Sequence, residues 1–182
     1  MNEKQQKRLS KFLSFILRHN PDQIGLELDI NGWADVSTLL TKINTENHTT
    51  TFEDLKKVVE NNDKKRFIFN LDQTKIKANQ GHTISIDLNL KPTKPPIKLF
   101  HGTATKNLNS IRDKGLIKGK RHHVHLSSDS ETARKVGMRY GKPIILSILS
   151  ETMDANGIKF YKTENNVWLT DFVAPKFIDF KD

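Results

Sequence analysis

Cysteine is absent from the 182-residue sequence, which excludes disulfide bridges, cysteine-ligated zinc, iron–sulfur clusters and thiol nucleophiles. Long apolar runs are also absent, because none approaches the ~18 residues that a membrane-spanning helix needs. The first ten residues are charged and polar, and they lack the apolar segment of a secretory signal. We therefore expect a cytoplasmic protein with no membrane partner.

Several nucleotide-binding and catalytic motifs are missing as well. The sequence has no Walker A loop and no G-x-G-x-x-G after an expected strand, so a bound nucleotide would need a non-Rossmann site. Neither a G-x-S-x-G nucleophile motif nor a pair of catalytic carboxylates stands out.

Positive charge is plentiful and unevenly distributed. The formal net charge is +9. Residues 1–90 hold 13 Lys and Arg against 12 Asp and Glu, whereas residues 91–182 hold 17 against 9. Residues 91–142 alone hold 13 basic and 3 acidic residues. This concentration suggests a polyanionic partner such as nucleic acid, although a merely solubilising surface would have the same composition.

Apolar spacing in the first half predicts three helices and a hairpin. The helices cover residues 3–19, a short segment after Asp35 and a segment after Thr51, which begins an approximate capping box. Residues 66–71 and 75–78 flank a polar turn and have the pattern of a β-hairpin. Three helices followed by a hairpin is the order of a winged helix, a variant of the helix-turn-helix nucleic-acid fold.

The proline-rich segment 91–96 marks a boundary between two lobes, because it interrupts both helices and strand ladders. Alternating apolar residues predict a strand over 84–90 just before it. We place the N-terminal lobe at residues 1–92 and the C-terminal lobe at residues 97–182.

The C-terminal lobe has the mixed pattern of an α+β domain. We predict helices over 105–114 and from a cap at Ser127 or Ser128 to 140. The predicted strands are 97–101, 124–126, 158–160, 167–169 and 143–149, the last buried on both faces.

Cationic and polar residues occur at the ends of several predicted elements of the first lobe. Arg18 and His19 end the first helix, where cations also simply complement the helix dipole. Arg66 opens the hairpin, and it matters only if the fold brings it near Arg18. A glycine and several polar donors follow the hairpin at residues 79–83, which with the preceding alanine read A-N-Q-G-H-T. Such a segment suits an anion, although an ordinary polar turn has the same composition.

The segment 121–127, R-H-H-V-H-L-S, is the densest cluster of the second lobe. On a strand, Arg121, His123 and His125 would share one face. We reject a metal site, because no carboxylate lies nearby on that face and the neighbouring basic residues would repel a divalent cation. These donors suit a phosphate better.

Eight short segments together are far more specific than any one of them. They read K-F-L-S-F-I-L-R-H-N-P (11–21), G-W-A-D (32–35), D-K-K-R-F (63–67), A-N-Q-G-H-T (78–83), L-F-H-G-T (99–103), R-H-H-V-H-L-S (121–127), A-R-K-V-G-M-R (133–139) and N-V-W-L-T (166–170). The chain resembles the tRNA 2′-phosphotransferase family, also called RNA 2′-phosphotransferase, along essentially its whole length. The resemblance implies a winged-helix RNA lobe and an NAD⁺ lobe similar to the ADP-ribosyltransferase fold of diphtheria toxin and the poly(ADP-ribose) polymerases.

The resemblance also implies the reaction. The family removes an internal 2′-phosphate from RNA such as spliced tRNA, using NAD⁺ as acceptor and no metal. The phosphate attacks the anomeric carbon of the nicotinamide ribose and releases nicotinamide, and the ribose 2″-hydroxyl then attacks the phosphorus. The products are RNA with a 2′-hydroxyl and ADP-ribose 1″,2″-cyclic phosphate.

Residue roles follow from the same resemblance. The family's catalytic Arg-His-Arg-Arg set falls on Arg18, His19, Arg66 and Arg121. His101 is expected to bond the ADP-ribose, and nicotinamide is expected to stack at His125. Val167 stands where the polymerases carry a catalytic glutamate, which argues against transfer to protein side chains. The secondary nucleotide contacts expected are Gly102, Thr103, Ser127 and Arg134.

The RNA phosphate contacts expected are Lys77, Asn79, Gln80 and His82. Lys77 replaces the family's common arginine, which keeps the charge but loses the bidentate fork. One alternative is ADP-ribosylation of an RNA terminal phosphate, and another is a non-catalytic winged-helix nucleic-acid binder. Retention of all four catalytic cations disfavours the binder. We expect the protein to be a monomer.

Overall fold

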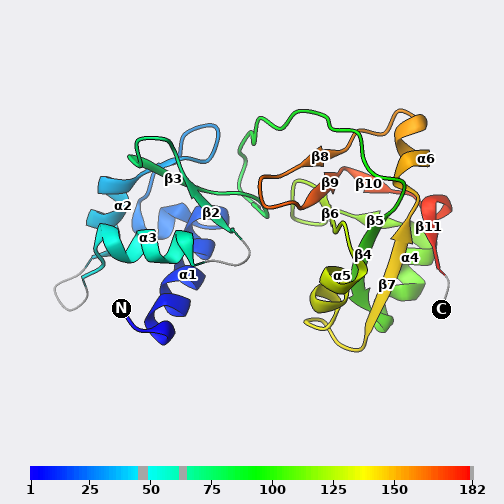
Figure 1. Ribbon diagram of the computed structural model, residues 1–182, viewed down its shortest axis with the longest axis horizontal. Coiled ribbons are helices and arrows are strands. Elements are labelled where there is room, and N and C mark those ends of the chain that lie inside the picture. Colours follow the sequence, from blue (N-terminus) through cyan, green and yellow to red (C-terminus); the bar gives the residue numbers. More distant parts are fainter. Residues whose placement is uncertain (45–48, 62–64, 181–182) are drawn as a thin grey trace. The chain divides into compact units, whose positions relative to one another are not determined.

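Figure 1 shows the computed structural model, which describes residues 1–44, 49–61 and 65–180. The chain divides into two compact units, Met1–Asn89 and Leu90–Asp182, and each has its own hydrophobic core. Both units combine helices with small antiparallel sheets, as expected of an α+β protein. Within the described ranges, no helix has both the length and the apolar character needed to cross a bilayer.

Three capped helices form most of the N-terminal unit. They are α1 (Glu3–Arg18), α2 (Val36–Ile43) and α3 (Phe52–Glu60). The side chains of Asn2, Asp35 and Thr51 each accept a backbone N–H of the first helical turn, and Thr51 forms the predicted capping box with Asp54. The apolar stripes face one core, which includes Leu13, Ile16, Leu17, Leu39, Leu55 and Val58. All three predicted helices are confirmed.

A three-stranded sheet completes this unit. Its strands are β1 (Ala34–Asp35), β2 (Phe67–Phe69) and β3 (Lys75–Ala78), in the order β1-β3-β2. Strands β2 and β3 form the predicted antiparallel hairpin, in which Phe67 lies opposite Ala78. A 3₁₀ helix, η1 (Pro21–Ile24), follows α1.

The predicted strand over residues 84–90 is wrong. Burial alternates along this segment as the sequence suggests, because Ile84, Ile86 and Leu88 are half-buried and the residues between them are exposed. The backbone nevertheless pairs with no strand. Instead, the N–H of Asp87 donates to the carbonyl of Ile30, and the carbonyl of Asp87 accepts from Asn31. Alternation reports which side chains are covered, and it does not report whether a neighbouring strand is available.

Three small antiparallel sheets make up the C-terminal unit. The first has the order β11-β7-β4, the second β6-β9-β8, and the third pairs β10 with β5. Their bounds are β4 (Leu99–Ala104), β5 (Leu116–Ile117), β6 (Val124–Leu126), β7 (Pro143–Ile148), β8 (Tyr161–Lys162), β9 (Trp168–Thr170), β10 (Phe172–Val173) and β11 (Ile178–Asp179). In β7, Leu146 and Ile148 are buried but Ile145 and Ser147 are half-buried, so one face is covered less fully than predicted.

The helices of this unit depart from the prediction at their ends. They are η2 (Thr105–Asn107), α4 (Leu108–Lys114), α5 (Ser130–Gly137), α6 (Ser150–Ala155) and η3 (Pro175–Phe177). The cap of α5 is Asp129, which accepts the N–H of Thr132 at 2.7 Å, and neither Ser127 nor Ser128. Ser127 pairs with β4 instead. The strand predicted at 158–160 is displaced to β8, and α6 was not predicted.

Two glycines let helix α5 pack directly on strand β4. A Cβ atom at Gly102 would overlap the carbonyl oxygen of Ala133, and a Cβ at Gly137 would lie 2.7 Å from the carbonyl oxygen of Thr103. Backbone therefore lies against backbone at both positions, and no side chain fits between them. This contact fixes the position of the β4 residues His101–Thr103 relative to α5, in the part of the unit that carries the candidate residues.

We expect Gly102→Ala to destabilise the protein by about 3 kcal/mol or more, because α5 must move away from β4. Gly119→Ala is the control, since nothing lies within 4 Å of its Cβ position. Gly119→Ala should lower the free energy of unfolding by about 1–2 kcal/mol only, because alanine is strained in the left-handed backbone conformation at this position. Urea unfolding measures both, and equal losses would contradict the packing account.

Candidate active site

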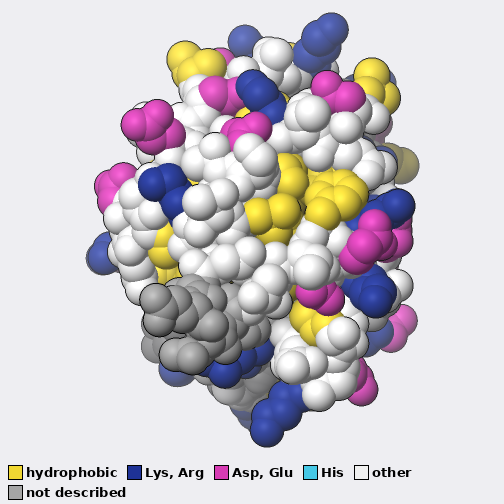
Figure 2. All heavy atoms as spheres, turned by 90° about the vertical axis from the view of Figure 1, so that its left-hand side faces the viewer, with side chains coloured by type: hydrophobic (Ala, Val, Ile, Leu, Met, Phe, Trp, Pro, Cys, Tyr) yellow, Lys and Arg dark blue, Asp and Glu magenta, His cyan; other side chains and the backbone are white. Residues whose placement is uncertain are grey.

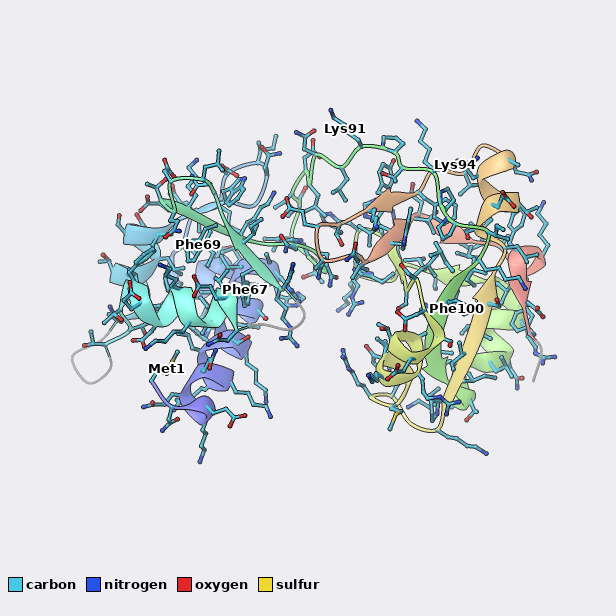
Figure 3. The ribbon with its side chains drawn as sticks, viewed as in Figure 1. Met1, Phe67, Phe69, Lys91, Lys94 and Phe100 are labelled. Carbon is cyan, nitrogen blue, oxygen red and sulfur yellow. The ribbon has the colours of Figure 1, made fainter. Side chains whose placement is uncertain are left out.

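The C-terminal end of α1 contacts the start of the hairpin. Arg18 is the last residue of α1 and is half-buried. Its Nη2 donates to the carbonyl oxygen of Arg66 at 3.4 Å, and its guanidinium carbon lies 6.0 Å from the ring centroid of Phe67, which Figure 3 labels on β2. The fold therefore brings Arg18 and Arg66 together, which is the condition for Arg66 to matter.

The loop after the hairpin is attached to both of these segments. At its start, the N–H of Asn79 donates to the carbonyl of Arg66 at 2.9 Å. At its end, the N–H of Thr83 donates to the carbonyl of Arg18, also at 2.9 Å. The loop thus joins residues that are 48 positions apart in the sequence, and it brings the A-N-Q-G-H-T motif beside the two arginines.

His19 is exposed and is oriented by the same loop. Its Nδ1 lies 3.0 Å from Oγ1 of Thr83, whose hydroxyl lies 3.5 Å from the carbonyl oxygen of Arg18. These contacts orient the imidazole ring of His19 on the end of the loop.

The interior of the loop is held by side chains that face into the unit. Asn79 is 8% exposed and donates through Nδ2 to the carbonyl of Lys65 at 2.7 Å. His82 is 1% exposed and lies against Gly32. Gly81 has φ +86°, and a Cβ there would lie 3.7 Å from Nη1 of Arg18. Asn79 and His82 thus support the loop from within, whereas Gln80 is half-exposed.

Lys77 on β3 lies over an aromatic ring that sequence reasoning did not include among the candidates. Its Nζ is 4.6 Å from the ring centroid of Trp33, within the range of a cation–π contact. Trp33 is held by Asp29, whose carboxylate accepts the N–H groups of Trp33 and Asn31 at 2.9 and 3.0 Å. The available signal was the tryptophan of the G-W-A-D motif.

In the C-terminal unit, β4 and β6 place two histidines side by side. One isolated bridge joins Phe100, labelled in Figure 3, to Ser127, with backbone hydrogen bonds of 2.9 and 2.8 Å. Beside it, Nδ1 of His101 lies 3.1 Å from the carbonyl oxygen of His125. Because that carbonyl can only accept, Nδ1 of His101 carries the proton and Nε2 is an acceptor.

The electrostatic surroundings keep His101 neutral. Burial lowers its pKa below the ordinary value of 6.5, and the bond to His125 raises it by less. The positive charge of Arg121 lowers the pKa further. Arg121 therefore lies close enough to His101 to act on it, which connects the predicted catalytic cation of this unit with the predicted nucleotide contact.

Arg121 is not on the predicted strand. Strand β6 begins only at Val124, and Arg121 lies in the preceding bend, where it is exposed and its N–H donates to the carbonyl of Lys118 at 3.2 Å. The expected common face of Arg121, His123 and His125 is therefore wrong. The ring of His123 packs on Tyr161, with centroids 5.5 Å apart. In the described part of the chain, no group of three His, Cys, Asp or Glu could hold a metal.

The remaining candidates have mixed surroundings. Thr103 is 5% exposed and its Oγ1 accepts from Asn107 at 3.1 Å. Gly102 is required by the packing of α5, and Arg134 is exposed on that helix. Val167 is half-buried and its N–H donates to Thr163.

Comparison with known proteins gives matches along nearly the whole chain. Residues 4–172 match the model of a family described as RNA 2′-phosphotransferase, Tpt1/KptA family. A Flavobacterium johnsoniae protein named probable RNA 2′-phosphotransferase is 56% identical over 100% of both chains. Proteins with the same name from Fusobacterium nucleatum and Pseudomonas fluorescens are 52% and 50% identical, over 95% and 98% of this chain and 97% and 98% of their own.

The lowered pKa of His101 predicts a pH-dependent stability. Below about pH 6.5 the unfolded chain takes up a proton that folded His101 resists, so the free energy of unfolding should fall as the pH decreases through this range. His101→Gln should lose part of that dependence. Urea unfolding at pH 7.5 and 5.5 measures it, and an identical pH dependence in variant and wild type would contradict the assignment.

Proposed function

Since the chain belongs to the RNA 2′-phosphotransferase (Tpt1/KptA) family, we propose that it transfers an internal RNA 2′-phosphate, such as that of a tRNA splice junction, to NAD⁺. The products would be RNA with a 2′-hydroxyl, nicotinamide and ADP-ribose 1″,2″-cyclic phosphate. The observation that carries the proposal is the cluster at the end of α1. There Arg18, His19 and Arg66 are held together by the loop 79–83.

Each unit has a part in this proposal. The three helices and the β2–β3 hairpin of the N-terminal unit support a winged-helix lobe that binds RNA. The C-terminal unit, with its small sheets joined at one bridge, supports an NAD⁺ lobe like that of the ADP-ribosyltransferases. The proposal divides the lobes at residues 1–92 and 97–182.

The residues of the C-terminal unit fit a dinucleotide without a glycine-rich loop. His101 is neutral and offers Nε2 as an acceptor for a ribose hydroxyl, while His125 lies beside it. The positive charge of Arg121 near His101 suits a phosphate. NAD⁺ supplies a carbon from which nicotinamide can leave as a neutral group.

The first step forms a bond between an oxygen of the RNA 2′-phosphate and C1″ of the nicotinamide ribose. The bond from C1″ to the nicotinamide nitrogen breaks, and its electron pair leaves with nicotinamide. His101 and His125 hold and orient the ribose for this step, so that attack and departure are in line. No proton has to move.

The second step closes the cyclic phosphate. The ribose 2″-oxygen bonds to the phosphorus, and the bond from phosphorus to the RNA 2′-oxygen breaks. The 2″-hydroxyl loses its proton and the RNA 2′-oxygen takes one up, so the step releases no net proton. Arg18 and Arg66 stabilise the negative charge on the phosphate oxygens, because guanidinium groups are permanently charged bidentate donors. His19 donates to the same phosphate.

The proposal is tested by incubating the protein with a 2′-phosphorylated oligoribonucleotide and NAD⁺ and identifying the products by mass spectrometry. We expect RNA lighter by one phosphate and equimolar nicotinamide, with or without EDTA. RNA that gains ADP-ribose and goes no further, above all at a terminal phosphate, would indicate a simple ADP-ribosyltransferase. An absence of nicotinamide would indicate a non-catalytic binder.

The division of roles predicts different kinetic defects. Arg18→Ala or Arg66→Ala should accumulate ADP-ribosylated RNA 2′-phosphate, because loss of a transition-state cation slows the second step by roughly 10²–10³. His101→Ala should slow formation of that intermediate, with none accumulating. A time course on a denaturing gel resolves the species. Accumulation only in His101→Ala would contradict the division.

The contact between Lys77 and Trp33 predicts a modest effect on RNA affinity. Lys77→Arg keeps both the charge and a cation over the ring, so the chemical step at saturating RNA should be nearly unchanged. Trp33→Leu should raise the KM for RNA about two- to fivefold by releasing Lys77, whereas Trp33→Phe should retain most of the affinity. Single-turnover rates at saturating RNA separate the chemical step from RNA affinity. A large fall of this rate in Lys77→Arg would indicate that Lys77 is itself catalytic.

A further inference from the structure

The positive charge of the C-terminal unit exceeds what a dinucleotide with two phosphates requires. Part of the excess lies in one exposed group, here named the basic corner, which comprises Lys106, Arg134, Met138, Arg139, Tyr140 and Lys142. No Asp or Glu occurs between residues 132 and 150. By contrast, basic and acidic side chains are interspersed on the face of the N-terminal unit that Figure 2 shows.

The backbone of the basic corner is fixed. After α5, the chain continues in hydrogen-bonded turns, in which Met138 donates to Arg134, Arg139 to Val136 and Tyr140 to Gly137, at 3.0 to 3.2 Å. The carbonyl of Lys142 accepts from the N–H of Thr105 at 3.0 Å, and this contact joins the corner to the segment that carries Lys106. Its side chains are therefore presented on a rigid support.

The basic corner is also attached to the strand that carries the candidate nucleotide residues. Gly137 packs against the backbone of Thr103 at the position where no Cβ fits. Thr103 is two residues from His101 on β4. A ligand on the corner would therefore lie on the same part of this unit as the proposed NAD⁺ contacts.

Fold stability does not account for these side chains. Tyr140 is 50% exposed and Met138 is 62% exposed, so neither contributes much to the core. The ion pairs among the described residues include Lys135 with Glu131 but none of the basic corner. The dipole of α5 accounts for Arg134, which lies in the last turn, but Arg139 and Lys142 lie beyond the helix.

We propose that the basic corner is a second RNA-binding surface, which takes single-stranded nucleotides flanking the 2′-phosphate. Tyr140 offers a ring on which a base stacks, and Arg139, Lys142 and Lys106 bind the adjoining phosphates. Aromatic rings interleaved with cations are the usual means of holding single strands without reading their sequence. The inference rests on the proposed function, because it places the flanking RNA beside the NAD⁺ lobe.

The test measures binding without turnover. Fluorescence anisotropy with a 2′-phosphorylated oligoribonucleotide, in the absence of NAD⁺, gives the Kd of wild type, Tyr140→Ala, Tyr140→Phe, Arg139→Ala and Lys142→Ala. We expect Tyr140→Ala to raise the Kd about fivefold or more and Tyr140→Phe to restore it. Arg139→Ala and Lys142→Ala should each lower the slope of log Kd against log salt by about 0.7, the single-strand value for one phosphate.

Lys114→Ala is the matched control, because Lys114 is an exposed cation on α4 of the same unit. It should leave both Kd and slope unchanged. Unchanged RNA affinity in all the corner variants would overturn the inference, as would a wild type that does not bind the oligonucleotide. A raised KM for NAD⁺ with unchanged RNA Kd would make the corner part of the dinucleotide site instead. Product analysis of the wild type tests the proposed function separately.

Discussion

Assembling several positive charges at one place opposes folding, and the N-terminal unit offsets this repulsion with backbone carbonyls and an aromatic face. Arg18 donates to the carbonyl of Arg66 and lies over Phe67, while its own carbonyl accepts from Thr83. The Arg18 guanidinium is thereby held in place before any anion arrives. A phosphate that enters such a preorganised cluster need not reorganise it, which is the main source of electrostatic catalysis.

The C-terminal unit has no G-x-G-x-x-G loop, and strand geometry positions the two histidines that we propose to hold NAD⁺. The bridge between Phe100 and Ser127 sets β4 beside β6, and the His125 carbonyl then fixes the tautomer of His101. Gly102 and Gly137 hold α5 against the same strand. These glycines therefore act on the site through packing, whereas a sequence motif alone suggests ligand contact for Gly102.

The parts of the structure that were predictable depend on local physics. Capping side chains and apolar spacing identify α1, α2 and α3, and a polar turn between alternating residues identifies the β2–β3 hairpin. The errors come from tertiary partners that no local pattern contains. Residues 84–90 have no neighbouring strand with which to pair. Ser127 pairs with β4, and Asp129 caps α5 instead. Strand β6 begins at Val124, after Arg121. Trp33 stands in the G-W-A-D segment, but no local pattern indicates that Lys77 lies over its ring.

The central claim is that the phosphate passes from the RNA 2′-oxygen to ADP-ribose, with the Arg18 cluster acting on the phosphorus. Tracing a ³²P label placed only at the internal 2′-phosphate tests this claim most directly. The account predicts that every label lost from RNA appears in ADP-ribose cyclic phosphate, and only when NAD⁺ is present. Label released as inorganic phosphate, or released without NAD⁺, would contradict it.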